Sequence, residues 1–188
     1  MNLPTFESFK PLKYKWPGIR LLEGTLDVPS PSELIVIGID PGVNFGITII
    51  ADTYVQVIYG KLPKKTRLGW HGIDAYDFII KALGTVEDET GIFYQHYRGA
   101  KAVVEGAAYD KIHGQVGLEE VRFGFFLALH HIGFNVSIVA PRSVRKIAFG
   151  SGNTTALDMW PLMNSNAADS IGCALVALHR EYNEETQE

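Results

Sequence analysis

Residues 34–61 read LIVIGIDPGVNFGITIIADTYVQVIYGK and contain three apolar runs separated by turn signals. The first run, 34–40, is rich in β-branched residues and ends at an acid, which predicts a buried strand. Pro41-Gly42 then favours a turn, and the runs 45–51 and 53–61 predict two more strands. Three consecutive strands joined by tight turns are typical of an antiparallel meander.

Helical and strand patterns alternate beyond this meander. In chain order, the apolar spacing predicts a helix over 71–83, a second helical piece over 92–98, a strand over 100–106, a helix over 117–132, a strand over 135–140, a helix beginning at Pro141, a short element between 153 and 162, and a helix over 167–182. Strands that alternate with helices favour parallel pairing. The sequence therefore predicts an α/β fold with a mixed five-stranded sheet, a three-strand antiparallel meander plus parallel strands, flanked by helices.

The composition is typical of a globular protein with a sizeable core. The chain has 188 residues, of which 46% are hydrophobic and 20% charged, and its formal net charge is −4. This charge argues mildly against a protein that coats nucleic acid without specificity. No apolar run is long enough to span a membrane and the N-terminus lacks the apolar core of a secretory signal, so we expect a cytoplasmic protein. A single cysteine, Cys173, excludes an internal disulfide and a cysteine-based zinc site.

Composition also divides the chain into three segments. Residues 1–33 hold five of the nine prolines and show no sustained periodicity, which predicts an extended N-terminal arm with one short strand around 19–22. Residues 34–180 carry the regular pattern of the α/β domain. Residues 181–188 contain four glutamates and predict an acidic tail.

Three acids fall where this fold brings strand ends and helices together. Asp40 and Glu105 each end a predicted strand, and Asp169 falls in the first turn of the last predicted helix, among small residues. If the two strands are adjacent and parallel, their acids share the sheet edge at which α/β sites form. Converging carboxylates repel one another, and two Mg²⁺ ions, with Mn²⁺ as a substitute, relieve that repulsion. The alternative is that each acid has a turn or helix-capping role. This alternative is a good explanation of any one acid, but a poorer explanation of all three together.

Four segments of the chain carry a recognisable set of motifs. They are IGIDPGVNFGITI (37–49), VVEGAAYDKIHGQVGLEEVRFGFF (103–126), APRSVRKIAFGSG (140–152) and NAADSIGCALVAL (166–178). In type and order they resemble the motifs of the RuvC family of Holliday junction resolvases, within the RNase H-like superfamily. The similarity covers roughly residues 34–180, and the shape is similar to the phage-type branch.

The resemblance implies a metal site and a reaction. Asp40, Glu105 and Asp169 would hold two Mg²⁺ ions that activate water to cut a DNA strand. The family carries an acid or a histidine three residues before the last acid, and here that position is Asn166. Its amide oxygen can coordinate a cation, but it brings no charge and cannot serve as a general base. We expect Asn166 to be the fourth, weaker member of the site.

The resemblance also implies DNA contacts. Relatives touch the junction through the loop at 106–117, where Tyr109 would stack on unpaired bases and Lys111 would assist. The alternatives are a tyrosine that anchors the loop and a solvated lysine. Two basic clusters would contact phosphates, with ordinary solvated surface as the alternative: Lys64 and Lys65, and Arg142, Arg145 and Lys146.

The expected function follows from the family. Its members dimerise through the helix equivalent to 117–132, and a junction with two-fold symmetry requires two active sites, so we expect a homodimer bound to branched DNA. The expected enzyme is an Mg²⁺-dependent endonuclease that resolves four-way junctions by symmetric paired nicks, leaving 5′-phosphate and 3′-hydroxyl ends, in a bacterium or a phage-infected cell.

One alternative is a related nuclease acting on flaps, other branched DNA or RNA–DNA hybrids. Another is a junction-binding architectural protein whose catalysis is weakened at Asn166. An actin-like phosphotransferase is disfavoured, because that fold needs a duplicated domain.

Overall fold

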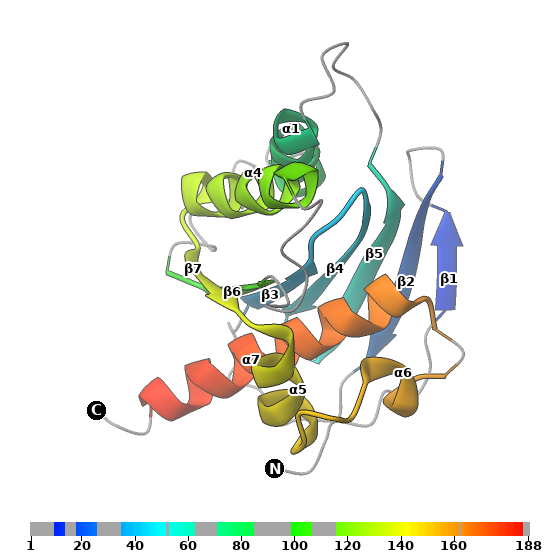
Figure 1. Cartoon of the computed structure of the whole chain (residues 1–188), viewed down its shortest axis with the longest axis vertical. Coiled ribbons are helices and arrows are strands. Elements are labelled where there is room, and N and C mark those ends of the chain that lie inside the picture. Colours follow the sequence, from blue (N-terminus) through cyan, green and yellow to red (C-terminus); the bar gives the residue numbers. More distant parts are fainter. Residues whose placement is uncertain are drawn as a thin grey trace.

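A mixed seven-stranded sheet forms the centre of the molecule (Figure 1). The computed structural model describes residues 10–13, 18–25, 35–51, 53–62, 71–84, 99–106, 116–161 and 163–185. The strands are β1 (Lys10–Lys13), β2 (Ile19–Thr25), β3 (Ile35–Asp40), β4 (Asn44–Ala51), β5 (Tyr54–Lys61), β6 (Lys101–Glu105) and β7 (Asn135–Val139). The helices are α1 (His71–Gly84), α4 (Val116–Ile132), α5 (Pro141–Phe149), α6 (Ala156–Met159) and α7 (Ser165–Glu185).

The predicted α/β fold class is confirmed. Strands β3, β4 and β5 form the antiparallel meander, and β6 and β7 continue the sheet in parallel from β3. The order across the sheet is β1-β2-β5-β4-β3-β6-β7. The first parallel strand is therefore hydrogen-bonded directly to the strand that carries Asp40.

The predicted sheet of five strands was too small. The short strand predicted around 19–22 is β2 of this sheet, and β1, which was not predicted, pairs with it. β2 pairs antiparallel with β5 from Ile19↔Gly60 to Thr25↔Tyr54, and β1 pairs with β2. These strands cover the edge of β5, which would otherwise present unpaired backbone groups. Pro11 lies in the outermost strand, where a missing amide hydrogen is tolerated.

The last helix is longer than predicted, and the short element before it is a helix. Helix α7 begins at Ser165 and continues to Glu185, so the first part of the predicted acidic tail is helical. The short element between 153 and 162 is α6, whose N-terminus is capped by Thr155 and Asp158. The helical piece predicted over 92–98 lies outside the described residues.

The two faces of the sheet are covered by different helices. Figure 1 shows α1 and α4 on one face and α7, with α5 and α6, on the other. One core cluster lies beneath α1 and α4 and contains the large side chains Phe45, Phe78 and Phe125. The second lies beneath α7 and is built mainly from valine and alanine. Among the described helices, none is long and apolar enough to cross a membrane.

Candidate active site

Two of the three predicted acids end neighbouring strands. β3 and β6 run parallel, and their register pairs Ile39 with Val104. Asp40 and Glu105 are the next residues along the two strands, so both lie at the same edge of the sheet. The expectation that these strands are adjacent and parallel is therefore confirmed.

Helix α7 brings the third acid to this edge because its backbone lies directly on the strands. A Cβ atom on Gly38 would lie 2.0 Å from the amide nitrogen of Ala174, and one on Gly46 would lie 1.9 Å from the carbonyl oxygen of Asn166. The helix is also tied to β4 by a 2.8 Å hydrogen bond between the hydroxyl groups of Thr48 and Ser170. Only glycines on the strands allow so close an approach.

The sequence predicted Asp169 in the first turn of the last helix. In the structure it lies in the second turn of α7. The helix begins at Ser165, and the side chain of Asn164 accepts hydrogen bonds from the amides of Asn166 and Ala167. The helix N-terminus is therefore capped without Asp169, and a capping role does not explain this acid.

Asn166 donates a hydrogen bond to Asp40. Its Nδ2 lies 2.8 Å from Oδ2 of Asp40 and 3.3 Å from the main-chain oxygen of Asn44. Both partners are acceptors, which fixes the amide with its nitrogen towards Asp40. In this arrangement Asn166 stabilises the ionised form of Asp40 through its nitrogen.

The cluster formed by Asp40, Glu105 and Asp169 carries more negative charge than the neighbouring cations neutralise. Burial, with the charge of Asp169 added, raises the pKa of Asp40 to about 6, although the hydrogen bond from Asn166 opposes the shift. Burial, then the charges of Asp40 and Asp169, and a hydrogen bond with Asp40 raise the pKa of Glu105 to about 8. Burial also raises the pKa of Asp169, and Arg145 opposes that shift. At neutral pH Glu105 therefore retains a proton that reduces the repulsion.

The donor set suits a divalent cation, although the side chains are not arranged as a finished site. Among the described residues, no group of three or more His, Cys, Asp or Glu side chains is placed to hold a metal ion. Carboxylate oxygens are nevertheless the ligands that Mg²⁺ and Mn²⁺ prefer. A cation could replace the proton on Glu105 as the charge that holds the carboxylates together, so the residues fit a divalent ion.

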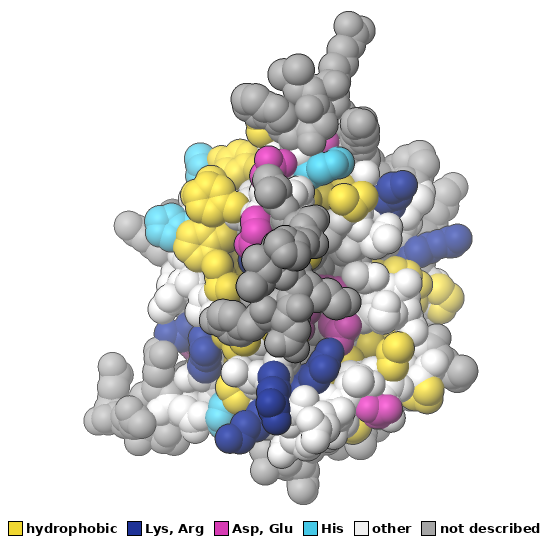
Figure 2. All heavy atoms as spheres, in the orientation of Figure 1, with side chains coloured by type: hydrophobic (Ala, Val, Ile, Leu, Met, Phe, Trp, Pro, Cys, Tyr) yellow, Lys and Arg dark blue, Asp and Glu magenta, His cyan; other side chains and the backbone are white. Residues whose placement is uncertain are grey.

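Basic side chains of α5 lie beside the acids. Arg145 is half-buried, and its charge lowers the pKa of Glu105 and of Asp169. Among the described residues its buried Nε has no hydrogen-bond partner. Arg142 and Lys146 are exposed on the same helix, and Figure 2 shows Lys and Arg side chains gathered over α5 with acidic side chains next to them.

The other predicted DNA contacts lie outside the described residues. They are Tyr109, Lys111, Lys64 and Lys65. Their predicted roles stay predictions.

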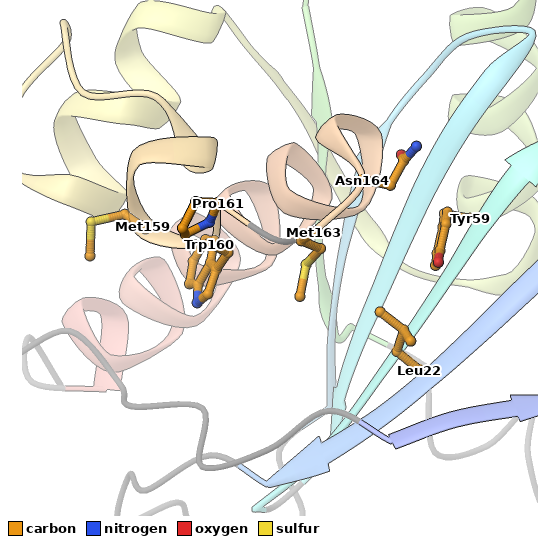
Figure 3. Close-up of a pocket in the computed structure, with 7 residues that line it drawn as sticks. All are labelled: Leu22, Tyr59, Met159, Trp160, Pro161, Met163 and Asn164. Carbon is orange, nitrogen blue, oxygen red and sulfur yellow. The ribbon is translucent and has the colours of Figure 1, made fainter.

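A separate cavity of about 470 Å³ lies on the same face of the sheet, between β2, β5 and the segment that leads into α7. Figure 3 shows Leu22 from β2 facing Trp160 and Met163. The residues that line the cavity in the described part of the chain include no charged side chain. The cavity is therefore unsuited to phosphate, and the charged chemistry lies at the carboxylate edge.

Arg122, a buried arginine of α4, was not among the residues predicted from the sequence. Its Nε donates a 2.8 Å hydrogen bond to the main-chain oxygen of Glu105, and its charge lowers the pKa of Asp40. The available signal was a charged residue between Val121 and Phe125 on the stripe that faces the core. A buried guanidinium needs a partner, and that requirement should have singled it out.

Comparison with known proteins defines the class of fold. No protein-family model matches the chain, and no curated protein matches it significantly. The sheet and its flanking helices nevertheless form an RNase H-like fold of the RuvC kind. The structure of Thermus thermophilus RuvC is similar with a TM-score of 0.53 at 16% identity, covering 79% of this chain and 97% of that one. T. thermophilus RuvC in complex with a Holliday junction substrate is similar with a TM-score of 0.50, again at 16% identity, covering 79% of this chain and 96% of that one.

Proposed function

We propose that this protein is a metal-dependent endonuclease that resolves four-way DNA junctions. The observation that carries the proposal is the convergence of Asp40, Glu105 and Asp169 at one sheet edge, with the basic side of α5 beside them. The RuvC-like fold supports it, since one similar structure is that of a complex with a Holliday junction. The phage-type subtype is part of the proposal, on the motifs alone.

In the proposed mechanism each residue of the cluster has its own task. The three carboxylates would hold Mg²⁺, or Mn²⁺ in its place, with Glu105 in its ionised form. Two ions held there would supply the Lewis acidity for activating water and stabilising the leaving oxygen. Asn166 orients Asp40, and Arg145 directs its unpaired Nε to the phosphate. The nicks leave 5′-phosphate and 3′-hydroxyl ends.

Further DNA contacts complete the proposal. Arg142 and Lys146 extend the phosphate-binding surface along α5. Tyr109 stacks on a base at the crossover, and Lys111, Lys64 and Lys65 contact the arms. The reaction takes place in the cytoplasm of a bacterium or an infected cell.

The active unit in this proposal is a homodimer formed through α4. Phe123, which is 60% exposed, lies on its outer surface with Leu127 and with Ile73 of α1, also exposed. These residues line a shallow apolar cavity of about 570 Å³ between the two helices. Clustered exposed apolar side chains of this kind are typical of protein interfaces. Two copies joined here would supply two sites for a two-fold symmetric junction.

The test is a cleavage assay on matched substrates. The purified protein is incubated with a labelled four-way junction, a linear duplex, a flap and an RNA–DNA hybrid, each with Mg²⁺, Mn²⁺ or EDTA. We expect symmetric nicks in the junction alone, dependent on metal, and their loss in Asp40→Asn with junction binding retained. Cleavage of the flap or hybrid in preference to the junction would indicate a different nuclease of the same superfamily.

A second candidate function is a junction-binding protein with weakened catalysis. It is favoured by the contact of Asn166, whose nitrogen and not its oxygen faces Asp40. The variants Asn166→Asp and Asn166→His test it by restoring a charged or basic ligand. If the missing ligand limits catalysis, cleavage should rise in at least one variant, and unchanged cleavage in both would refute this explanation.

A further inference from the structure

Arg122 is a buried cation of α4, between the fully buried apolar residues Val121 and Phe125. Its side chain is 6% exposed, on the core-facing side of α4. It forms an ion pair with Glu119 one turn earlier, and its Nε donates to the main-chain oxygen of Glu105. A buried guanidinium is retained only when its hydrogen bonds offset the loss of hydration. The choice of a main-chain partner at the end of β6 therefore needs a reason.

The peptide unit between Glu105 and Gly106 is held from both sides. Its carbonyl oxygen accepts the 2.8 Å hydrogen bond from Arg122, and its amide donates a 2.7 Å hydrogen bond to the main-chain oxygen of Val139. Because the peptide unit is planar, two opposed hydrogen bonds fix its rotation and with it the ψ angle of Glu105. The chain also lies close to β7 here, since a Cβ on Gly106 would be 3.2 Å from a methyl group of Ile138.

We propose that Arg122 is a positioning residue, which fixes the backbone of Glu105 so that its carboxylate meets Asp40 and Asp169 at the sheet edge. The inference rests on the proposed function in treating Glu105 as a metal ligand. Outer groups that orient a ligand typically change metal affinity ten- to a hundred-fold when removed. A role confined to joining β6 to α4 would change folding stability and leave the ligand geometry intact.

The variants are Arg122→Met, which removes the donor, and Arg122→Lys, which retains one donor in a different position. The matched control is Arg180→Met, because Arg180 of α7 is also partly buried and donates to the side chain of Ser137 on β7. Thermal unfolding of each metal-free variant shows how much stability each arginine contributes. If Arg122→Met does not fold, Arg122→Lys is judged by the same criteria.

The first measurement is amide hydrogen exchange at Gly106 in the metal-free protein. We expect exchange at Gly106 to accelerate at least about ten-fold in Arg122→Met, less in Arg122→Lys, and not in Arg180→Met. Unchanged exchange at Gly106 in Arg122→Met would overturn the proposal. This measurement needs neither metal nor DNA.

The second measurement is Mn²⁺ binding by titration calorimetry. We expect the dissociation constant to rise about ten-fold or more in Arg122→Met and to be unchanged in Arg180→Met. Faster exchange at Gly106 with unchanged Mn²⁺ affinity would leave Arg122 a structural role only, and would also overturn the proposal. If the wild-type protein binds no Mn²⁺, the proposed function fails, while Gly106 exchange still decides whether Arg122 positions this backbone.

Discussion

The two faces of the sheet are packed in opposite ways. Beneath α1 and α4 the space is filled by large side chains, and the ring of Phe45 lies 4.7 Å from that of Phe78 and 6.0 Å from that of Phe125, centre to centre. Beneath α7 the side chains are smaller, and at Gly38 and Gly46 the helix backbone lies directly on the strands. The first face gains its stability from buried apolar area. The face beneath α7 buries less apolar side-chain area at these glycines, and the position of the helix backbone is fixed there instead.

The charged site lies on the face where position is fixed by backbone contact. A helix held by large side chains can repack when one of them changes, whereas a helix that touches a strand through glycine has no room to move. Close helix contact through glycine also occurs on the other face, where a Cβ on Gly124 would be 2.1 Å from the oxygen of Gly72. That contact joins α1 to α4, and neither helix carries an acid of the site.

The largest expected effect on cleavage comes from Glu105→Gln, on the face of the sheet that α7 covers. We expect junction cleavage to fall more than about a hundred-fold, because even groups that only orient ligands cost up to that much. The metal-free variant should unfold at a higher temperature than wild type at pH 8.5, because a buried charge is removed. The control is Asp77→Asn, which breaks only the exposed pair with Lys81 and should change neither quantity. Full cleavage by Glu105→Gln would exclude this residue as a ligand.

The next effect compares the faces directly through Gly46→Ala and Gly124→Ala. Each added methyl group overlaps a backbone oxygen, so both variants should lose about 1–3 kcal/mol of unfolding free energy in denaturant titrations. Only Gly46→Ala displaces the start of α7, which carries Asp169, so we expect the larger loss of junction cleavage in Gly46→Ala, about ten-fold or more, under conditions where both are folded. Equal losses of cleavage in the two variants would show that the site does not depend on how α7 approaches the sheet.

The sequence predicted the meander, the parallel strands and the long helices, because each has a clear local pattern. The run 34–40 and the turn at Pro41-Gly42 define β3 and the start of β4 without any knowledge of tertiary structure. The strands β1 and β2 were harder, because Pro11 and the mixed polarity of β2 give weak local signals. Their reason for being strands is the unpaired edge of β5, which is a tertiary property.

The positions of the three acids were predictable from local patterns. Asp40 and Glu105 each end a strand, and Asp169 lies near the start of a helix rich in small residues. The contacts that orient them were not, since they join residues far apart in the chain. Asn166 and Asp40 are separated by 126 positions, and the direction of the amide depends on the carbonyl of Asn44. Arg122 acts on a main-chain atom of Glu105, and no pattern of side-chain types reveals that.

A smaller effect is the pH dependence of stability in the metal-free protein. The pKa values of Asp40 and Glu105 are raised to about 6 and about 8 in the folded state, so folding favours their protonated forms. Their stabilising contribution is complete below pH 4 and is lost as pH rises through 6 and 8. We expect the melting temperature to fall between pH 5 and pH 9, and Mn²⁺ to reverse much of the fall at pH 8.5. In Glu105→Gln the fall above pH 7 should disappear; its persistence would place the titrating group elsewhere.

The smallest effect on folding is expected for Phe123→Ser on the outer surface of α4. This side chain is 60% exposed, so its removal should change the unfolding free energy of the monomer by less than about 0.5 kcal/mol. If the apolar surface of α1 and α4 joins two copies, the variant should sediment as a monomer at concentrations where wild type is a dimer, and should replace paired nicks by single ones. Leu157→Ser is the matched control, because Leu157 of α6 is an exposed apolar residue on the other side of the sheet and should leave the dimer intact. A dimer that survives Phe123→Ser and dissociates in Leu157→Ser would place the interface at α6, on the opposite face of the sheet.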